Sequence, residues 1–181
     1  MKHMNLLQLA LGLVLAACNT TGALAQDAAA PSPSPVPKVN LLASENGGQI
    51  LAAPDKKWNV MIDGKEDTHA EVAWGSEGVF AFKDEKPATF DTFSVLIPAA
   101  DSGNIKEFEL LAGDTLDGDF RSVGKFQARN LLMLKTKGWQ DFKFDPVTAK
   151  YLKLKVISRF EGASWNAVNV YEIRLMGSLK N

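Results

Sequence analysis

The clearest strand in the sequence is Tyr151-Leu152-Lys153-Leu154-Lys155-Val156, where apolar and basic residues alternate. A period of two turns the leucines and the valine to one face and the lysines to solvent. Turn-forming sequences such as Asn46-Gly47-Gly48 and Asp117-Gly118 separate further stretches of strand character. These are Gln49–Ala52, Glu71–Ala73, Val79–Phe82, Thr92–Ile97, Ile105–Leu111, Phe120–Phe126, Leu131–Leu134, Asp141–Phe144 and Val168–Leu175. Short strands without intervening helices predict an all-β fold, either an antiparallel β-sandwich or a jelly roll.

Composition excludes several classes of function. The chain has 181 residues, with 20 basic and 21 acidic side chains and a net charge of −1, so it lacks the excess positive charge of nucleic-acid-binding proteins. One Cys, Cys18, and two His, His3 and His69, exclude a thiolate zinc site, an intrachain disulfide and a His-rich metal centre. No hydrolase motif or phosphate-binding loop occurs. We therefore expect that the protein is not an enzyme.

The N-terminus has the features of an export signal. Lys2 and His3 precede an apolar run that ends at Ala17, which is too short to span a bilayer, where about 20 residues are needed. The run ends in Leu15-Ala16-Ala17-Cys18, which resembles the bacterial lipobox, whose Cys carries a diacylglycerol after cleavage. We predict a signal peptide over residues 1–17 and a lipid anchor on Cys18.

A second cleavage site leaves an alternative. Ala23-Leu24-Ala25 fits ordinary signal peptidase, and cleavage after Ala25 would release a soluble periplasmic or secreted protein. Both interpretations place the mature protein outside the cytoplasm. With the lipid, it would be a membrane-anchored cell-envelope protein, and Asn19 resembles the residue found in outer-membrane lipoproteins of Gram-negative cells.

A linker separates this signal from a single domain. Residues 18–38 are rich in Ala, Pro and Ser, and the alternating prolines from Pro31 to Pro37 favour an extended polyproline II conformation. The segment is either a spacer that holds the domain away from a membrane or a neck without a further role. We predict one domain over residues 39–178.

Four motifs in that domain resemble a known family. They are Ile62-Asp63-Gly64 with Asp67-Thr68, Phe108-Glu109-Leu110-Leu111 followed by Asp117-Gly118-Asp119-Phe120, Ala149-Lys150-Tyr151-Leu152-Lys153-Leu154, and Tyr171-Glu172-Ile173-Arg174-Leu175 before Gly177. In this order they resemble the landmarks of discoidin or coagulation-factor 5/8 type C domains, which include the family 32 carbohydrate-binding modules. The resemblance implies a galactose-binding-domain-like jelly roll. The paired cysteines of many animal members are absent, and the usual aromatic after Asp-Thr is displaced to Trp74.

The Asp-Gly loop predicts a cation site. A hard cation such as calcium takes about six to eight oxygen ligands, and this loop places carboxylates and a hydroxyl around Gly64. By the resemblance, the ligands of a structural calcium would be Asp63, Asp67, Thr68 and Glu172, with carbonyls near Ile62 and Lys65. Glu172 supports this independently, because it interrupts an apolar strand and needs a partner if buried. The alternative is a turn held by Asx hydrogen bonds, with Glu172 exposed or salt-bridged.

The loop from Arg159 to Asn166 is the candidate ligand site, because it combines aromatic and polar side chains. Sugar-binding proteins stack an aromatic ring on a pyranose and fix its hydroxyls with polar groups. The resemblance implies Trp165 or Phe160 as the stacking ring, hydrogen bonds from Arg159 and Asn166, and His69 facing them. In the alternative, Phe160 and Trp165 fill the end of the sandwich and Arg159 pairs with Glu161; this alternative is favoured for Phe160 and His69.

The other tryptophans have different expected places. We predict Trp58 and Trp74 in the core, and Trp139 either exposed or as a lid on the sandwich. Together, these observations predict a non-catalytic cell-envelope module that binds a carbohydrate or glycan and is tethered as a lipoprotein. The alternative is a protein-interaction or structural lipoprotein with an envelope protein as its partner, and the next is an envelope-anchored enzyme.

Overall fold

The structure is a computed structural model that describes residues 36–97, 103–129, 137–160 and 167–180. The chain divides into two units, Met1–Ser34 and Pro35–Asn181, and the fold below is that of the second unit. Among the described residues, no helix has both the length and the apolar character needed to cross a membrane.

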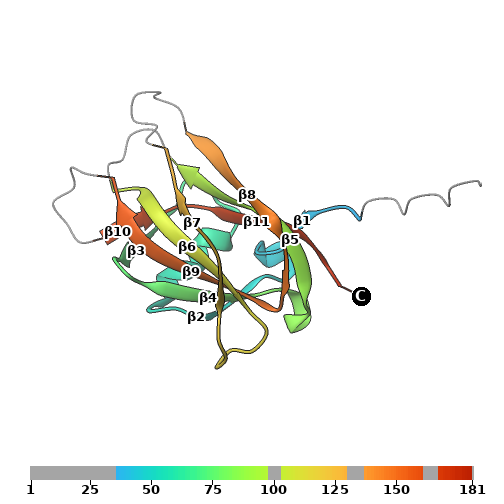
Figure 1. The fold of residues 1–181 in the computed structure, drawn as a ribbon. Coiled ribbons are helices and arrows are strands. Elements are labelled where there is room, and N and C mark those ends of the chain that lie inside the picture. The colour runs from blue at the N-terminus through green and yellow to red at the C-terminus, as the bar shows by residue number, and fades with distance from the viewer. Residues whose placement is uncertain (1–35, 98–102, 130–136, 161–166, 181) are drawn as a thin grey trace, which may run out of the picture. The chain divides into compact units, whose positions relative to one another are not determined.

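Two antiparallel sheets pack as a β-sandwich (Figure 1). One sheet has the order β1 (Val39–Asn40), β11 (Ile173–Leu179), β5 (Ala88–Ile97) and β8 (Gly138–Ala149). The other has the order β2 (Gln49–Ala52), β4 (Glu77–Ala81), β9 (Tyr151–Arg159), β6 (Ile105–Gly113) and β7 (Arg121–Gln127). The predicted all-β sandwich is thus confirmed.

A small third sheet marks one end of the sandwich. It consists of β3 (Ala70–Ala73) and β10 (Ala167–Val170), which pair with Ala73 opposite Ala167. At the other end, β1 pairs with Met176 and Gly177 of β11, with Val39 opposite Gly177 (Figure 1). The first and last strands of the domain therefore lie together, away from β3 and β10.

The core lies between the two large sheets. The predicted alternation of buried and more exposed side chains in β9 is confirmed, because Leu152, Leu154 and Val156 are buried. The strand lies between β4 and β6. Across the sandwich, the ring of Phe108 on β6 lies 5.4 Å from that of Phe93 on β5 and 5.0 Å from that of Phe142 on β8. Aromatic contacts therefore join the two sheets.

Three short 3-10 helices occur in the described segments: Ser44–Asn46, Lys56–Ile62 and Lys83–Glu85. The second carries Trp58, which is buried, as predicted, and covers Gly78 of β4. A Cβ atom on Gly78 would lie only 2.3 Å from the Trp58 ring, so the close packing of helix and strand requires glycine at this position.

The structure divides the predicted strand Val168–Leu175 into β10 and β11, with Tyr171 and Glu172 between them. Glu172 is buried in a pocket beside the Asp-Gly loop rather than paired in a regular strand. The expected strand Leu131–Leu134 lies outside the described residues.

Candidate functional site

Trp74 is the one aromatic residue among the exposed large apolar side chains of the described segments, and 54% of its surface is exposed. It directly follows β3 and precedes Gly75, whose φ of +73° turns the chain towards β4. The amide of Gly75 donates a hydrogen bond to the carbonyl of Val156 at 2.9 Å, which fixes this turn. The prediction that Trp74 lies in the core is wrong, because the chain has already left the small sheet at this residue.

Arg159, the last residue of β9, lies beside Trp74. Its guanidinium carbon is 5.5 Å from the centre of the Trp74 ring, within the range of a cation–π contact. Its Nη1 donates a hydrogen bond to the carbonyl of Ala167 at 3.0 Å, so β10 also holds the side chain. Arg159 was predicted to donate hydrogen bonds to a ligand, and the structure places it against the ring of Trp74.

The remaining predicted ligand residues have different surroundings. Phe160 is 8% exposed and belongs to the core, which agrees with the interpretation that it fills the end of the sandwich. The half-buried His69 ring packs on Tyr171, with ring centres 4.8 Å apart. His69 and Trp74 flank opposite ends of β3, roughly 16 Å apart along an extended chain. Trp165 and Asn166 lie outside the described residues.

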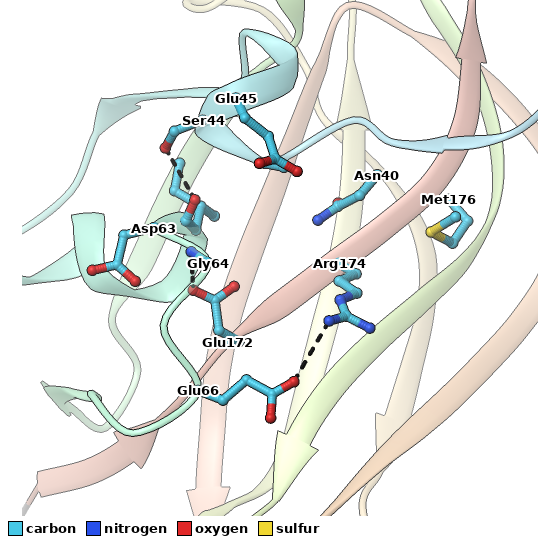
Figure 2. Close-up of a pocket in the computed structure, with 11 residues that line it drawn as sticks. Asn40, Ser44, Glu45, Asp63, Gly64, Glu66, Glu172, Arg174 and Met176 are labelled. Carbon is cyan, nitrogen blue, oxygen red and sulfur yellow. Dashed lines mark hydrogen bonds and ion pairs between the residues drawn. The ribbon is translucent and has the colours of Figure 1, made fainter.

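A second region is a pocket of about 420 Å³ beside β1, the loop after the second 3-10 helix, and β11 (Figure 2). Four carboxyl groups and one guanidinium line it, so the pocket is acidic. Its polar lining residues are Asn40, Ser44, Glu45, Asp63, Glu66, Glu172 and Arg174.

Glu172 is the buried carboxyl group of this pocket, with 4% of its surface exposed. Its Oε1 accepts a hydrogen bond from the amide nitrogen of Gly64 at 2.7 Å (Figure 2). Burial raises the pKa of Glu172 to about 7; the hydrogen bond from Gly64 opposes this rise, and the neighbouring Asp63 carboxyl adds to it. The alternative in which Glu172 is exposed is therefore wrong.

The predicted calcium ligands come together in part. Asp63 Oδ1 accepts a hydrogen bond from the amide of Lys65 at 2.9 Å, which is the Asx turn of the alternative interpretation. Thr68 Oγ1 donates to the carbonyl of Lys65 at 3.2 Å. No three His, Cys, Asp or Glu side chains within the described segments form a metal-binding group. An ion bound here would therefore need loop oxygens besides the carboxyl groups of Asp63 and Glu172.

A cluster that the sequence did not predict lies at the rim of the pocket. The Glu66 cluster consists of Glu66, Lys137, Trp139 and Arg174. Glu66 Oε1 accepts a hydrogen bond from Trp139 Nε1 at 3.2 Å and lies 3.7 Å from Arg174 Nη2; Glu66 Oε2 lies 3.1 Å from Lys137 Nζ. The hydrogen bonds from Lys137 and Trp139 hold the pKa of Glu66 below its usual range. Trp139 is half-buried, so it is not the fully exposed residue of one of the two predicted alternatives.

No protein-family model and no curated protein matches the sequence. Solved structures do match. The family 32 carbohydrate-binding module of Streptococcus pneumoniae EndoD has a TM-score of 0.57 and 18% identity over 76% of this chain and 98% of that one. A module from Clostridium perfringens in complex with GalNAc-β-1,3-galactose has a TM-score of 0.56 and 17% identity, over 76% and 99% of the two chains.

A third match is the family 32 module of C. perfringens NanJ in complex with galactose, with a TM-score of 0.57 and 15% identity over 77% of this chain and 98% of that one. This chain has the fold of a family 32 carbohydrate-binding module. The expected galactose-binding-domain-like jelly roll is therefore confirmed. Because one fold serves many functions, the ligand of this family 32-like domain has to be argued from its own residues.

Proposed function

We propose that this domain is a non-catalytic carbohydrate-binding module. The observation that carries the proposal is the exposed Trp74 ring, which lies beside Arg159 at the end of the sandwich. A planar ring of this kind can stack on the apolar face of a pyranose. Two proteins with the same fold bind sugars, galactose in one and GalNAc-β-1,3-galactose in the other.

The surroundings of Trp74 support a stacking role. Trp74 follows Ala73, which pairs with Ala167, and both are small residues. A Cβ atom placed on Gly75 would meet no atom within 4 Å, apart from its chain neighbours, so the turn is open at this residue. Arg159 packs on Trp74 and on the carbonyl of Ala167, which limits the motion of the ring before a ligand arrives. A single stacked ring contributes on the order of 1 kcal/mol beyond the area it buries, so we expect weak affinity.

Trp74→Ala tests this function in a soluble form of the protein, residues 19–181, which lacks the predicted signal peptide and the predicted lipid anchor on Cys18. We expect a glycan array to detect selective sugar binding by the wild type, and Trp74→Ala to weaken that binding by at least about tenfold. Leu116→Ala is the matched control, because Leu116 is also an exposed apolar residue, at 45%. Wild-type affinity in Trp74→Ala would place the site elsewhere. No binding across the array, with co-purification of an envelope protein, would support a protein-interaction module.

We also propose a structural calcium ion at the Asp-Gly loop. Asp63 and Glu172 would supply carboxylates, and Thr68 and the carbonyl of Lys65 would supply further oxygens. The proposal is supported by the contacts within this loop and by the hydrogen bond from Gly64 to Glu172, just before β11. Two neighbouring carboxyl groups, one buried, favour a cation between them, since its charge stabilises both anions. The ion would join the loop to β11. Asp67 remains a predicted ligand.

We further propose that the mature protein is exported and anchored in the cell envelope by a lipid on Cys18. The lipobox sequence Leu15-Ala16-Ala17-Cys18 supports this proposal. An alkyne fatty acid should label the wild type in cells and leave Cys18→Ser unlabelled. A mature N-terminus at Gln26 would show cleavage by ordinary signal peptidase instead.

A further inference from the structure

We propose that Glu66 is a positioning residue, which anchors the loop of residues 63–68 to the four-stranded sheet. The anchoring surface consists of Trp139 and Arg174 on that sheet and of Lys137, just before β8. The loop holds Glu172 through Gly64, so this anchor also determines how well the loop holds its contact with Glu172. The last step of the inference, an effect on cation affinity, rests on the proposed calcium site.

The contacts of Glu66 converge from two strands that lie far from it in the sequence. Trp139 is 73 residues away and belongs to β8, while Arg174 belongs to β11. Both carboxylate oxygens of Glu66 have partners, and Lys137 Nζ also donates a hydrogen bond to the backbone carbonyl of Glu66 at 2.7 Å. The loop is therefore held through its side chain and its backbone at one residue.

The anchoring surface has a fixed geometry. The guanidinium carbon of Arg174 lies 3.6 Å from the centre of the Trp139 ring, a close cation–π contact. Arg174 is thus in contact with Trp139 while it faces the Glu66 carboxylate (Figure 2). A preordered cation loses less side-chain freedom when it forms an ion pair, so this pair is stronger than one between two mobile side chains.

Two attachments hold the loop to the same short segment of chain. The buried one joins the amide of Gly64 to Glu172, and the exposed one joins Glu66 to Arg174, two residues further along (Figure 2). Both Glu172 and Arg174 line the pocket. Loss of the ion pair between Glu66 and Arg174 should therefore weaken the hydrogen bond from Gly64 to Glu172, because only Lys65 separates Gly64 from Glu66.

Glu77 provides a matched control. Its carboxylate lies 3.5 Å from Lys153 Nζ and 3.2 Å from Lys155 Nζ, and its side chain is 40% exposed, compared with 43% for Glu66. Glu77 is on β4 and both lysines are on β9, two strands that backbone pairing already joins. Its ion pairs therefore hold no loop in place, although they are similar in number and exposure.

Hydrogen exchange of the Gly64 amide measures the anchor without any metal. In chelator, Glu66→Gln keeps an acceptor for Trp139 but loses the charge, and we expect exchange at Gly64 to become roughly three- to tenfold faster. Glu77→Gln should leave it unchanged. Raising the salt from about 0.05 to 1 M should speed the exchange in the wild type and have less effect in Glu66→Gln, because salt screens ion pairs. Equal protection of Gly64 in wild type and Glu66→Gln would overturn the proposal.

Calcium titration of the same variants separates this inference from the metal site. If the wild type binds calcium, Glu66→Gln should weaken the affinity by several-fold and Glu77→Gln should not. An unchanged affinity in Glu66→Gln would overturn the link to the cation. If the wild type binds no calcium, the calcium site itself fails, and faster exchange at Gly64 in Glu66→Gln still establishes the anchor.

Discussion

Trp74 and Trp139 each lie beside an arginine, and their surroundings differ. Arg159 is 5.5 Å from the Trp74 ring centre and bonds a backbone carbonyl, and more than half of the Trp74 surface stays in solvent. The guanidinium carbon of Arg174 is 3.6 Å from the Trp139 ring centre, and Glu66 accepts a hydrogen bond from the indole N–H of Trp139. Because the carboxylate of Glu66 accepts this hydrogen bond, the pair of Trp139 and Arg174 is a structural contact.

The comparison shows that residue types alone do not separate a binding surface from a structural one. Tryptophan and arginine are both frequent in binding sites and both useful in packing. The two cases are distinguished by the exposed fraction of the tryptophan ring and by the group that accepts a hydrogen bond from its indole N–H. Four measurements test the distinction.

Trp58→Ala sets the scale for a tryptophan that is structural without question. Trp58 is 1% exposed, and its ring covers Gly78. Removing a buried Trp side chain leaves a cavity, and we expect unfolding free energy in urea to fall by about 3–5 kcal/mol. A loss below about 1 kcal/mol would mean that neighbouring side chains refill the space.

Burial of Glu172 in the pocket should make the free energy of unfolding depend on pH. A folded-state pKa of about 7, above the ordinary value of 4.5, means that the native state binds more protons than the unfolded chain between these values. The contribution of protonated Glu172 to the free energy of unfolding is fully present below pH 4.5 and is lost as pH rises through 7. The total loss is up to about 3 kcal/mol.

Urea denaturation at pH 5 and pH 8 in chelator measures this effect. Glu172→Gln should remove it, while Trp74→Ala should keep the wild-type difference. Added calcium should restore stability at pH 8, by about 2.7 kcal/mol at a hundredfold excess over Kd, and Asp63→Ala should abolish that gain. An identical pH dependence in wild type and Glu172→Gln would contradict the raised pKa.

Trp139→Ala should have an intermediate effect. It removes a half-buried ring, its contact with Arg174 and its hydrogen bond to Glu66, and we expect a loss of roughly 1–2 kcal/mol of unfolding free energy. Trp139→Phe keeps a ring for Arg174 and should lose less. Wild-type stability in Trp139→Ala would show that the cluster is only a surface contact.

Trp74→Ala should have the smallest effect on stability. An exposed side chain at a turn contributes little to folding, so we expect a change within about 0.5 kcal/mol by calorimetry. The same variant is the one expected to lose sugar binding. A loss of unfolding free energy as large as that of Trp139→Ala would mean that Trp74 has a structural role. The tryptophan–arginine pairs at Trp74 and Trp139 would then not differ in this respect.

Local pattern was sufficient to predict much of the fold. The alternation from Tyr151 to Val156 identified a central strand. The pairing of the Asp-Gly loop with Glu172 came from the family resemblance, not from local pattern. The position of Trp74 was not predictable, because it depends on the pairing of Ala73 with Ala167, far away in the chain. The Glu66 cluster was missed for the same reason, since its members come from a loop and two distant strands.

The arrangement of the two ends of the sandwich has a consequence for how the domain meets its surroundings. The chain enters through β1 at one end, and Trp74 follows β3 at the other (Figure 1). Anything attached to the N-terminus, whether a lipid or another domain, would hold the module by the end opposite its exposed aromatic ring. The end of the sandwich that carries Trp74 is thus separate from the end through which the chain enters, and an attachment at the N-terminus would leave it free for a ligand to approach.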